Sequence, residues 1–582
     1  MSSAAAHASR SDNSAPKAWL RALEMTARID TAPRRTLPVV IEELGARFGD
    51  APALLSPSGN FSHADLAAQT NRYARWALAQ GIAKGDVVAL LMPNRAEYLA
   101  IWLGISRIGG VVALLNTNLS GAALAHCLTV ANPRHLILDA RLDAALDGLE
   151  IGAMVWRHGE GFADFMRGFS GAALEDSEQR DVTLSDPALL IYTSGTTGLP
   201  KAAFVSHHRV MMWTHWFAGL MDAKPSDRLY NCLPMYHSVG GVVASGAALL
   251  AGGAVILREK FSATRFWDDI AQSGATIFQY IGELCRYLLK ADAEPGAHAL
   301  RLICGNGLSA DVWEDFQNRF EIPQILEFYA ATEGNFSLFN VEGRPGAIGR
   351  IPGFLKHRMG VALIRRGADG EPLRGPDGLC QRVITGEAGE AIGKIAAGAA
   401  RFEGYSDAAA TAKKILRHVF EQGDAYVRTG DLMRQDASGF FYFVDRLGDT
   451  FRWKGENVAT TEVAAALAAY PGIRAANVYG VMVPDADGRA GMAALETDAE
   501  FDLKGLKAHL QKRLPAYARP VFLRLVGSLA VTETFKQKKQ DLLAEGFDPE
   551  RIVDPLYAEL GDGYEPLDPA LYARINSGLT RL

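Results

Sequence analysis

The apolar positions of this chain follow two alternating patterns from about residue 36 to about residue 445. Short runs of consecutive apolar residues stand at 87–92, 136–138, 189–191, 254–257, 276–278 and 302–304. Longer stretches between them, such as 95–108 and 309–320, repeat their apolar residues at helical spacing. Apolar runs that alternate with helices are typical of βαβ units. The pattern therefore predicts an α/β fold with layered, largely parallel sheets.

The pattern changes twice further along the chain. Between Gly386 and Asp445 the segments become shorter and are interrupted by glycines and charges, which indicates a β-rich subdomain. After Arg446, helical patterns at 461–470 and 503–514 indicate a separate small α+β domain. We therefore predict a flexible N-terminal tail at 1–35, a large domain at 36–446 that includes the β-rich subdomain, and a small mobile C-terminal domain at 447–582.

Composition and charge narrow the class of protein. A chain of 582 residues, 48% apolar and 22% charged, is expected to be globular with more than one domain. The net charge of −6 gives no reason to expect nucleic acid as a partner. Five scattered cysteines without C-x-x-C spacing indicate reduced thiols. We expect a cytoplasmic protein, and the sequence leaves a peripheral membrane contact and a homodimer open.

One uncharged window, Ser238–Leu257, has the length of a membrane span. It contains five glycines, and Gly252-Gly253 divides it into a helix-like half and a strand-like half. A buried helix, a turn and a strand therefore explain it better than a transmembrane segment.

A loop rich in glycine and hydroxyl side chains follows the strand-like run that ends at Tyr192. It comprises Thr193, Ser194, Gly195, Thr196, Thr197 and Gly198, and Lys201 follows three residues later. Glycines let several backbone N–H groups turn toward one point, hydroxyls add donors, and a lysine adds positive charge. The loop is therefore predicted to bind nucleotide phosphates, in preference to being a flexible surface loop. It does not have the spacing of a Walker loop.

A second glycine-rich segment, Gly305, Asn306 and Gly307, begins a match to the dinucleotide fingerprint G-x-G-x-x-[GA]. It follows a strand-like run, begins a helical pattern, and has Glu327 about 20 residues later. By itself it favours binding of NAD or FAD. However, the fingerprint normally opens its domain, whereas here it comes after the loop at Thr193, so a different role is preferred.

Two further groups of residues suit a nucleotide. Within Tyr329–Gly334, the ring of Tyr329 can stack on a base, Thr332 can bond a phosphate, and Glu333 can hold Mg²⁺. The plain alternative is that Thr332 and Glu333 cap a helix. Asp431 and Arg446 suit opposite sides of a ribose, although single residues of these types are more often found in turns or on surfaces.

Taken in order, these segments resemble the motifs of the adenylate-forming superfamily, which includes acyl-CoA synthetases, luciferases and peptide-synthetase adenylation domains. The resemblance spans roughly residues 36–550. It implies ATP, Mg²⁺ and coenzyme A as cofactors or co-substrates. It also implies that the segment from Thr193 to Lys201 binds the β- and γ-phosphates, and that the segment 305–307 lines the adenine pocket beside Tyr329. Asp431 and Arg446 would then hold the ribose.

The same resemblance implies the reacting groups. Thr332 is expected at the α-phosphate, Glu333 at the metal ion, and His237 near the substrate carboxylate. Lys536 is expected to be the adenylation lysine, carried by the C-terminal domain. Gly448 is expected to be the hinge about which that domain rotates.

Several details point to one branch of the superfamily. Phe535 stands before Lys536 where the family usually has glycine, and the strings 452–457, 234–238 and 329–335 fit as well. Together they resemble the fatty acid transport protein and very-long-chain acyl-CoA synthetase branch. The resemblance implies a fatty acyl-CoA synthetase that works through an acyl-adenylate and then forms a thioester with coenzyme A.

Three alternatives remain from the sequence. A CoA ligase for a bile acid, a carnitine-type acid or an aromatic acid would use the same reaction. A non-catalytic fatty-acid-binding or uptake protein would use the fold without turnover. An NAD- or FAD-dependent oxidoreductase is the third and rests on the fingerprint at Gly305. The small residues Gly240, Gly241, Ala244 and Gly246 suit either a groove for an alkyl chain or close helix packing.

Overall fold

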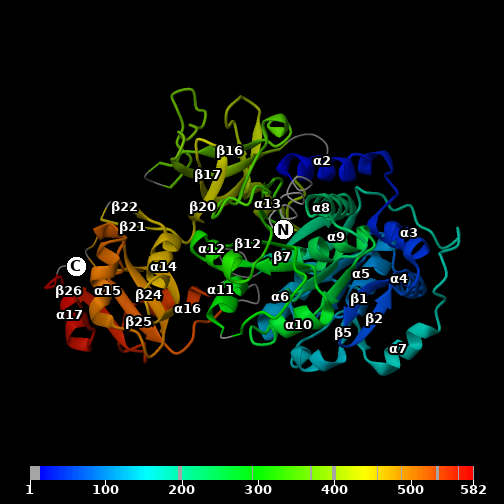
Figure 1. Ribbon diagram of the computed structural model, residues 1–582, viewed down its shortest axis with the longest axis horizontal. Coiled ribbons are helices and arrows are strands. Elements are labelled where there is room, and N and C mark those ends of the chain that lie inside the picture. Colours follow the sequence, from blue (N-terminus) through cyan, green and yellow to red (C-terminus); the bar gives the residue numbers. More distant parts are fainter. Residues whose placement is uncertain are drawn as a thin grey trace, which may run out of the picture. The chain divides into compact units, whose positions relative to one another are not determined.

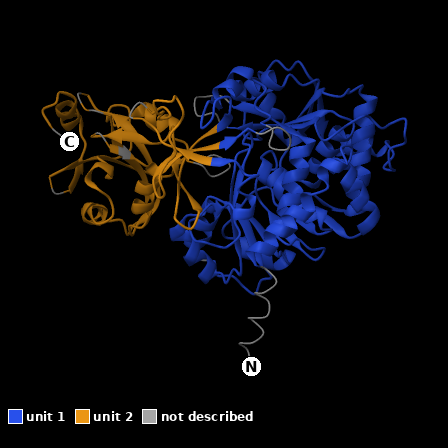
Figure 2. Cartoon of the chain, turned by 90° about the horizontal axis from the view of Figure 1, so that it is seen from above, with its two compact units in different colours: residues 1–361, 393–427 blue, residues 362–392, 428–582 orange. Residues whose placement is uncertain are grey.

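The structure is a computed structural model that describes residues 14–193, 200–291, 293–367, 370–395, 402–454, 456–484, 486, 488–531, 537–561 and 563–580. The chain forms two compact units (Figure 2). Unit 1 comprises residues 1–361 and 393–427, and unit 2 comprises residues 362–392 and 428–582. The predicted α/β fold is confirmed, and all six apolar runs that predict strands belong to strands.

Two large sheets form the frame of unit 1 (Figure 1). The first has eight strands, of which the inner six run parallel and the two edge strands run antiparallel to their neighbours. Its spatial order is β14 (Ser337–Asn340), β13 (Ile325–Ala330), β12 (Leu302–Asn306), β11 (Ile277–Ile281), β9 (Arg228–Asn231), β10 (Ala254–Leu257), β1 (Pro52–Ser56) and β2 (Gly59–Ser62).

The second sheet of unit 1 has six strands and is parallel except for its last strand. Its order is β6 (Met154–His158), β5 (His135–Asp139), β3 (Val87–Leu91), β4 (Val111–Leu114), β7 (Pro187–Thr193) and β8 (Lys201–Ser206). Its inner strands β5, β3, β4 and β7 are almost fully buried, as continuous apolar runs require when both faces of a parallel sheet are covered, whereas the edge strand β6 is partly exposed.

Helices cover the sheets on both faces. One helix, α5 (Ala96–Arg107), contacts strands of both sheets and is buried on nearly every side, which its apolar sequence allows. It packs among α3 (Leu37–Phe48) and α4 (His63–Ala79), while α8 (His207–Leu220) contacts α3 and α9 (Ser245–Leu250). The remaining helices of unit 1 with eight or more residues are α6 (Gly121–Ala131), α7 (Glu160–Arg167), α10 (Phe266–Ser273), α11 (Gly282–Lys290) and α12 (Ala310–Arg319), besides α2.

The N-terminal helix α2 (Ala15–Thr26) packs on α8. Trp19 is buried, and its ring lies edge-on to Trp216 and Phe339 at centroid distances of 5.9 and 5.8 Å. The segment 1–35, predicted as a flexible tail, therefore contains a helix that is part of the core of unit 1.

Unit 2 contains strands that lie in the order β20 (Phe440–Arg446), β19 (Ala425–Gln435), β17 (Ala388–Lys394) and β16 (Val361–Ile364). The boundary between the units falls within three of these strands, since the first residues of β16 and β19 and the last residues of β17 belong to unit 1. A five-stranded sheet follows: β23 (Ile473–Met482), β24 (Arg489–Thr497), β25 (Phe522–Val526), β26 (Leu556–Leu560) and β27 (Gly563–Pro566). The hairpin of β21 (Phe451–Trp453) and β22 (Glu456–Val458) and the helices α14 (Thr460–Ala468) and α15 (Leu503–Gln511) complete its core.

The uncharged window at 238–257 folds as the sequence predicts. It contains a π-helix at Val239–Ala244, helix α9 and strand β10. No helix in the described part of the chain combines the length and the hydropathy that crossing a bilayer requires.

Candidate active site

The predicted site residues of unit 1 lie near the carboxyl ends of parallel strands. Thr193 ends β7, Asn306 ends β12, and Thr332 and Glu333 follow β13. His237 follows β9 by a short turn. Open α/β sheets bind their ligands at the carboxyl ends of the strands, because the loops there converge and leave polar backbone groups accessible. The topology therefore places these residues where a ligand site is expected.

A hydrogen-bonded group surrounds Glu333. The hydroxyl of Tyr405 donates to Glu333 Oε1 at 2.8 Å, and Lys414 Nζ lies 4.0 Å from the same oxygen. The Nζ atom of Lys201 lies 5.7 Å from the centre of the Tyr405 ring, within the range of a cation–π contact. Tyr405 therefore links Lys201, which follows the predicted phosphate loop, to Glu333.

Electrostatics in this group keep the phenol of Tyr405 neutral. Burial and the neighbouring carboxylate of Glu333 raise the pKa of Tyr405 above its ordinary value, which keeps its proton on the oxygen. A phenol that stays protonated can donate to the carboxylate at all working pH values. The side chain of Glu333 is 16% exposed, so a ligand can still reach it.

The segment around Thr332 is held on two sides. Arg209, on α8, donates from a guanidinium nitrogen to the carbonyl oxygen of Thr332 at 2.6 Å. The hydroxyl of Ser238 lies 3.3 Å from the hydroxyl of Thr332. Because Ser238 directly follows His237, this contact brings the predicted carboxylate-binding turn next to the predicted α-phosphate-binding residue. The structure thus brings together Thr193, Lys201, Thr332, Glu333 and the segment that carries His237.

The glycines after His237 allow close packing. A β-carbon added at Gly241 would lie 1.9 Å from the carbonyl oxygen of Met235, and one at Gly246 would lie 2.1 Å from a methyl group of Thr214. Of the two interpretations that the sequence leaves open for these residues, close helix packing is the one that the structure supports. Gly240 is similar, because its added β-carbon would lie 2.5 Å from the carbonyl oxygen of Pro234.

The predicted adenine loop is stabilised by a buried carboxyl group. Glu327, on β13, accepts from the backbone N–H groups of Gly307 at 2.5 Å and Leu308 at 3.2 Å, and from the hydroxyl of Tyr280. Gly305 packs so tightly that an added β-carbon would lie 2.1 Å from the carbonyl oxygen of Tyr280. The N–H groups that would hold a dinucleotide pyrophosphate are therefore already bound to Glu327, which argues against the oxidoreductase alternative.

The ionisation of Glu327 gives the first testable prediction. Burial raises the pKa of Glu327 to about 8, although its hydrogen bonds act in the opposite direction. An unfolded glutamate titrates near pH 4.5. The stabilisation from the protonated group is therefore complete below pH 4.5 and is lost as the pH rises through about 8. Relative to Glu327→Gln, the wild type should lose up to about 1.4 kcal/mol of unfolding free energy per pH unit across this window.

Denaturant unfolding of the wild type and Glu327→Gln between pH 5 and pH 9 measures this difference, since other titrating groups cancel in the comparison. If the difference in unfolding free energy between the two proteins does not change with pH, the hydrogen bonds from Gly307, Leu308 and Tyr280 keep Glu327 ionised throughout, and burial does not raise its pKa.

The ribose pair lies in unit 2. Asp431 on β19 and Arg446 on β20 are opposite each other in the antiparallel register, with 3.7 Å between Arg446 Nε and a carboxylate oxygen of Asp431. Thr429 supports this end of β19, because its hydroxyl donates to the Ala391 carbonyl and accepts from the N–H of Asp431. Gly448 lies in the turn between β20 and β21.

Six predicted site residues lie outside the described residues: Ser194, Gly195, Thr196, Thr197, Gly198 and Lys536. Tyr329, which is described, ends β13 together with Ala330 and has its ring 5.8 Å from that of Phe336. Among the described residues, no three His, Cys, Asp or Glu side chains gather as metal ligands.

Local sequence did not reveal the role in this site of four residues. Tyr405 and Arg209 are isolated in the sequence from the motifs that they contact, so no local spacing marks them. Ser238 adjoins a motif but is an ordinary serine in composition. In the sequence, Glu327 stands out only as the acidic residue of the dinucleotide fingerprint. Its role becomes visible only in the structure, where Glu327 on β13 lies opposite Gly305 on the neighbouring strand β12.

The site joins Thr193 and Lys201, which flank the glycine- and hydroxyl-rich loop, to an acidic residue and a histidine-bearing turn, an arrangement suited to nucleotide-dependent activation of an acid. Residues 41–362 match the family described as AMP-binding enzyme, and residues 462–536 match its C-terminal domain. The chain belongs to the AMP-binding enzyme family, and its predicted membership of the adenylate-forming superfamily is confirmed.

The relatives cover nearly all of the chain. Long-chain fatty acid transport protein 1 of Mus musculus is 40% identical in a match of 572 positions, with 93% of this chain and 88% of that protein covered. Medium/long-chain-fatty-acid–CoA ligase FadD6 of Mycobacterium tuberculosis is 39% identical over 550 residues, covering 92% and 90%. The crystal structure of ATP-bound MatB from Rhodopseudomonas palustris matches with a TM-score of 0.74, 26% identity and coverage of 86% and 98%. The predicted resemblance to the fatty acid transport protein branch is confirmed.

Proposed function

We propose that this protein is an AMP-forming fatty acyl-CoA synthetase. The observation that carries the proposal is the group around Glu333, which unites Lys201 of the predicted phosphate-binding segment, a carboxylate and the Ser238–Thr332 contact. It occurs in a chain that is about two-fifths identical, over nine-tenths of its length, to a fatty acid–CoA ligase and to fatty acid transport proteins.

The reaction has two steps. A carboxylate oxygen of the acid first attacks the α-phosphorus of ATP, the bond from phosphorus to the bridging oxygen breaks, and pyrophosphate leaves. The thiol sulfur of coenzyme A then attacks the acyl carbon, AMP leaves, and the thiol proton is released. The first step brings an anion to a polyanion, so positioning and charge neutralisation supply most of the catalysis.

The roles of the residues of unit 1 follow from the resemblance to the adenylate-forming superfamily. Thr332 binds the α-phosphate, and the hydroxyl of Ser238 orients that of Thr332. Lys201 and the loop from Thr193 to Gly198 bind the departing pyrophosphate. His237 lies near the substrate carboxylate. These assignments stay proposals, as do adenine binding at 305–307 and Tyr329 and ribose binding at Asp431 and Arg446.

Glu333 is proposed to hold Mg²⁺. The fit is chemically sound, because Mg²⁺ is usually bound by one or two carboxylates together with phosphate oxygens and water. The hydrogen bond from Tyr405 and the ion pair with Lys414 both reach Oε1 of this carboxylate. The ion would supply neutralisation of the charge that develops on the phosphates.

The C-terminal domain is proposed to begin at residue 447, to pivot at Gly448 and to carry Lys536 to the α-phosphate and carboxylate. Its rotation after adenylation would withdraw the lysine and admit coenzyme A. The location is proposed to be the cytoplasm, where thiols stay reduced, since the five cysteines are buried and none of them forms a disulfide.

The test is pyrophosphate release by purified protein with ATP, Mg²⁺ and coenzyme A, across acids from acetate to C24 together with benzoate and cholate. Release that is greatest with a long alkyl acid supports the proposal. Release only with a ring-bearing acid keeps the reaction and replaces the substrate class. ATP-independent binding of fatty acid without release would support the non-catalytic binding protein instead.

A further inference from the structure

The turn that carries His237 is bonded to a buried asparagine from another part of unit 1. Asn94, 6% exposed, follows β3, and its side-chain nitrogen donates to the carbonyl oxygens of Leu233 at 2.8 Å and Arg258 at 2.9 Å. Its side-chain oxygen accepts from the N–H of Met235 at 2.9 Å. One amide group thus satisfies two backbone groups of the turn Leu233–His237.

A second buried asparagine holds the same turn from the other side. Asn231, fully buried at the end of β9, accepts from the N–H of Leu233 at 3.1 Å and donates to the carbonyl oxygen of Gly240 at 2.8 Å. The Gly240 carbonyl lies in the π-helix and also accepts from the hydroxyl of Ser245 at 3.1 Å. π-helical turns are rare and are found frequently at functional sites, so the hydrogen bond from Asn231 to this π-helix indicates a functional role for the asparagine.

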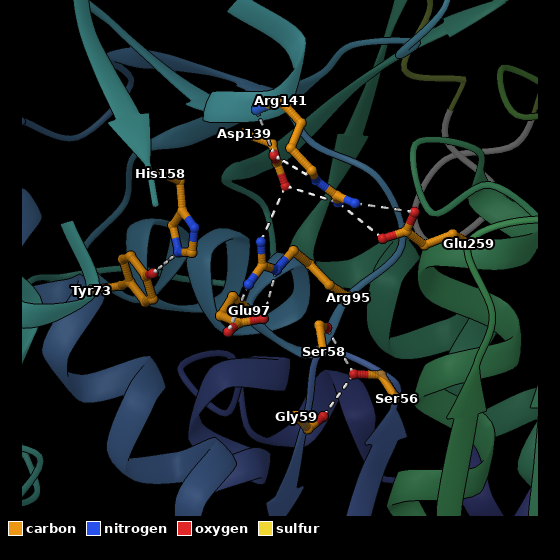
Figure 3. Close-up of polar contacts among 10 residues, drawn as sticks. All are labelled: Ser56, Ser58, Gly59, Tyr73, Arg95, Glu97, Asp139, Arg141, His158 and Glu259. Carbon is orange, nitrogen blue, oxygen red and sulfur yellow. Dashed lines mark hydrogen bonds and ion pairs between the residues drawn. The ribbon is translucent and has the colours of Figure 1, made fainter. Parts of the chain in front are cut away.

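An ion-pair network holds the backbone segment that carries Asn94 (Figure 3). Arg95, next to Asn94, pairs with Glu97 at 2.9 Å and with Asp139 at 3.1 Å. Arg141 then joins Asp139 to Glu259. Glu259 follows Arg258, whose carbonyl oxygen Asn94 binds, so the segments 94–95 and 258–259 are connected twice.

We propose that Asn94 and Asn231 are positioning residues that fix the turn Leu233–His237, and with it the imidazole of His237 and the hydroxyl of Ser238. The two side chains bind the turn by three hydrogen bonds, two from Asn94 and one from Asn231, and Asn231 makes a further one to Gly240 just beyond the turn. An amide suits this role because it offers both donors and an acceptor without charge, which matters in a buried place. The proposal rests on the proposed function only where it assigns His237 to the acid.

This support matters because the turn positions two groups at once, the imidazole of His237 and the hydroxyl of Ser238. Ser238 contacts Thr332 at 3.3 Å, so a shift of the turn moves the His237 side chain and the Thr332 hydroxyl relative to each other. Misplacement of a reacting group by about 1 Å can cost about 100-fold in rate. Positioning by Asn94 and Asn231 should therefore act on use of the acid more than on binding of ATP.

The first experiment needs no turnover. In protein labelled with ¹³C in its histidine rings, the His237 resonance is assigned by its loss in His237→Ala. Asn94→Ala and Asn231→Ala are expected to shift this resonance. Asn340→Ala is the matched control, since Asn340 is fully buried and donates to the carbonyls of Arg344 and Ala347 while accepting from the N–H of Arg344. Asn340→Ala should leave the His237 resonance in place.

The second experiment measures pyrophosphate release. Asn94→Ala is expected to lower kcat/KM for the acid about tenfold or more and to change the KM for ATP less than about twofold. In the His237→Ala background the same change should cost less than about twofold, because both variants disturb one arrangement. Asn340→Ala should lower the melting temperature comparably and leave kcat/KM for the acid unchanged. Asn94→Ser serves if the alanine variant does not fold.

The outcomes separate this inference from the proposed function. A shifted His237 resonance without acid-dependent release in the wild type supports the positioning role and contradicts the synthetase assignment. An unmoved resonance in the Asn94 and Asn231 variants overturns the positioning role, whether or not the enzyme is active. Fully multiplicative losses in the Asn94/His237 double variant also overturn it.

Discussion

Lys536→Ala is expected to reduce acyl-adenylate formation by at least about 100-fold and to spare thioester formation from preformed acyl-AMP. The reason is charge. Adenylation joins a carboxylate to a triphosphate, and a lysine at the α-phosphate offsets repulsion that exists only in that step. Thiol attack on the neutral acyl carbon of the adenylate does not need the same cation.

The two half-reactions are measured separately, by pyrophosphate exchange and by conversion of synthetic acyl-AMP to acyl-CoA. Lys538→Ala is the control, because Lys538 is exposed and lies two residues away. Equal loss of both half-reactions in Lys536→Ala would show that another residue is the adenylation lysine.

Glu333→Gln is expected to lower kcat/KM for ATP by about 100-fold or more and to raise the Mg²⁺ concentration needed for half-maximal rate. Glutamine has nearly the same shape as glutamate but lacks the negative charge that we propose binds the Mg²⁺ ion. Tyr405→Phe keeps the ring beside Lys201 but removes the hydroxyl that donates to Glu333 Oε1. A loss of about tenfold is expected for it, since the carboxylate stays but loses its orientation.

Titration of pyrophosphate release with Mg²⁺ distinguishes these effects. Glu342→Gln provides the control, because Glu342 is a carboxylate of the same unit that pairs with Arg350. An unchanged Mg²⁺ requirement in Glu333→Gln would contradict the metal assignment and leave Glu333 with a purely structural role at Tyr405.

The strands and helices of unit 1 were predictable because their signals are local. The runs 87–92, 189–191 and 302–304 are continuous and apolar, and the structure covers the corresponding strands on both faces. The uncharged window at 238–257 was also predictable, because Gly252, at positive φ, and Gly253 form the turn between α9 and β10.

The interpretation of the glycine-rich segments needed more than local sequence. The match at Gly305 has the residues of a dinucleotide fingerprint, and only the pairing of β12 with β13 shows that Glu327 occupies its N–H groups. The glycines at 240–246 suited either a groove or close packing, and only the positions of Met235 and Thr214 decide for close packing.

Local sequence was sufficient to establish the α/β class, the superfamily and the order of the nucleotide motifs, because each motif is a short segment whose residue types carry the chemistry. Tertiary structure decided which distant side chains complete the site. Tyr405 is 72 residues from Glu333, and Asn94 is 139 residues from Leu233, yet each pair is joined by one hydrogen bond of 2.8 Å. Such contacts depend on how strands far apart in the chain become neighbours in a sheet, and no spacing within a single sequence encodes them.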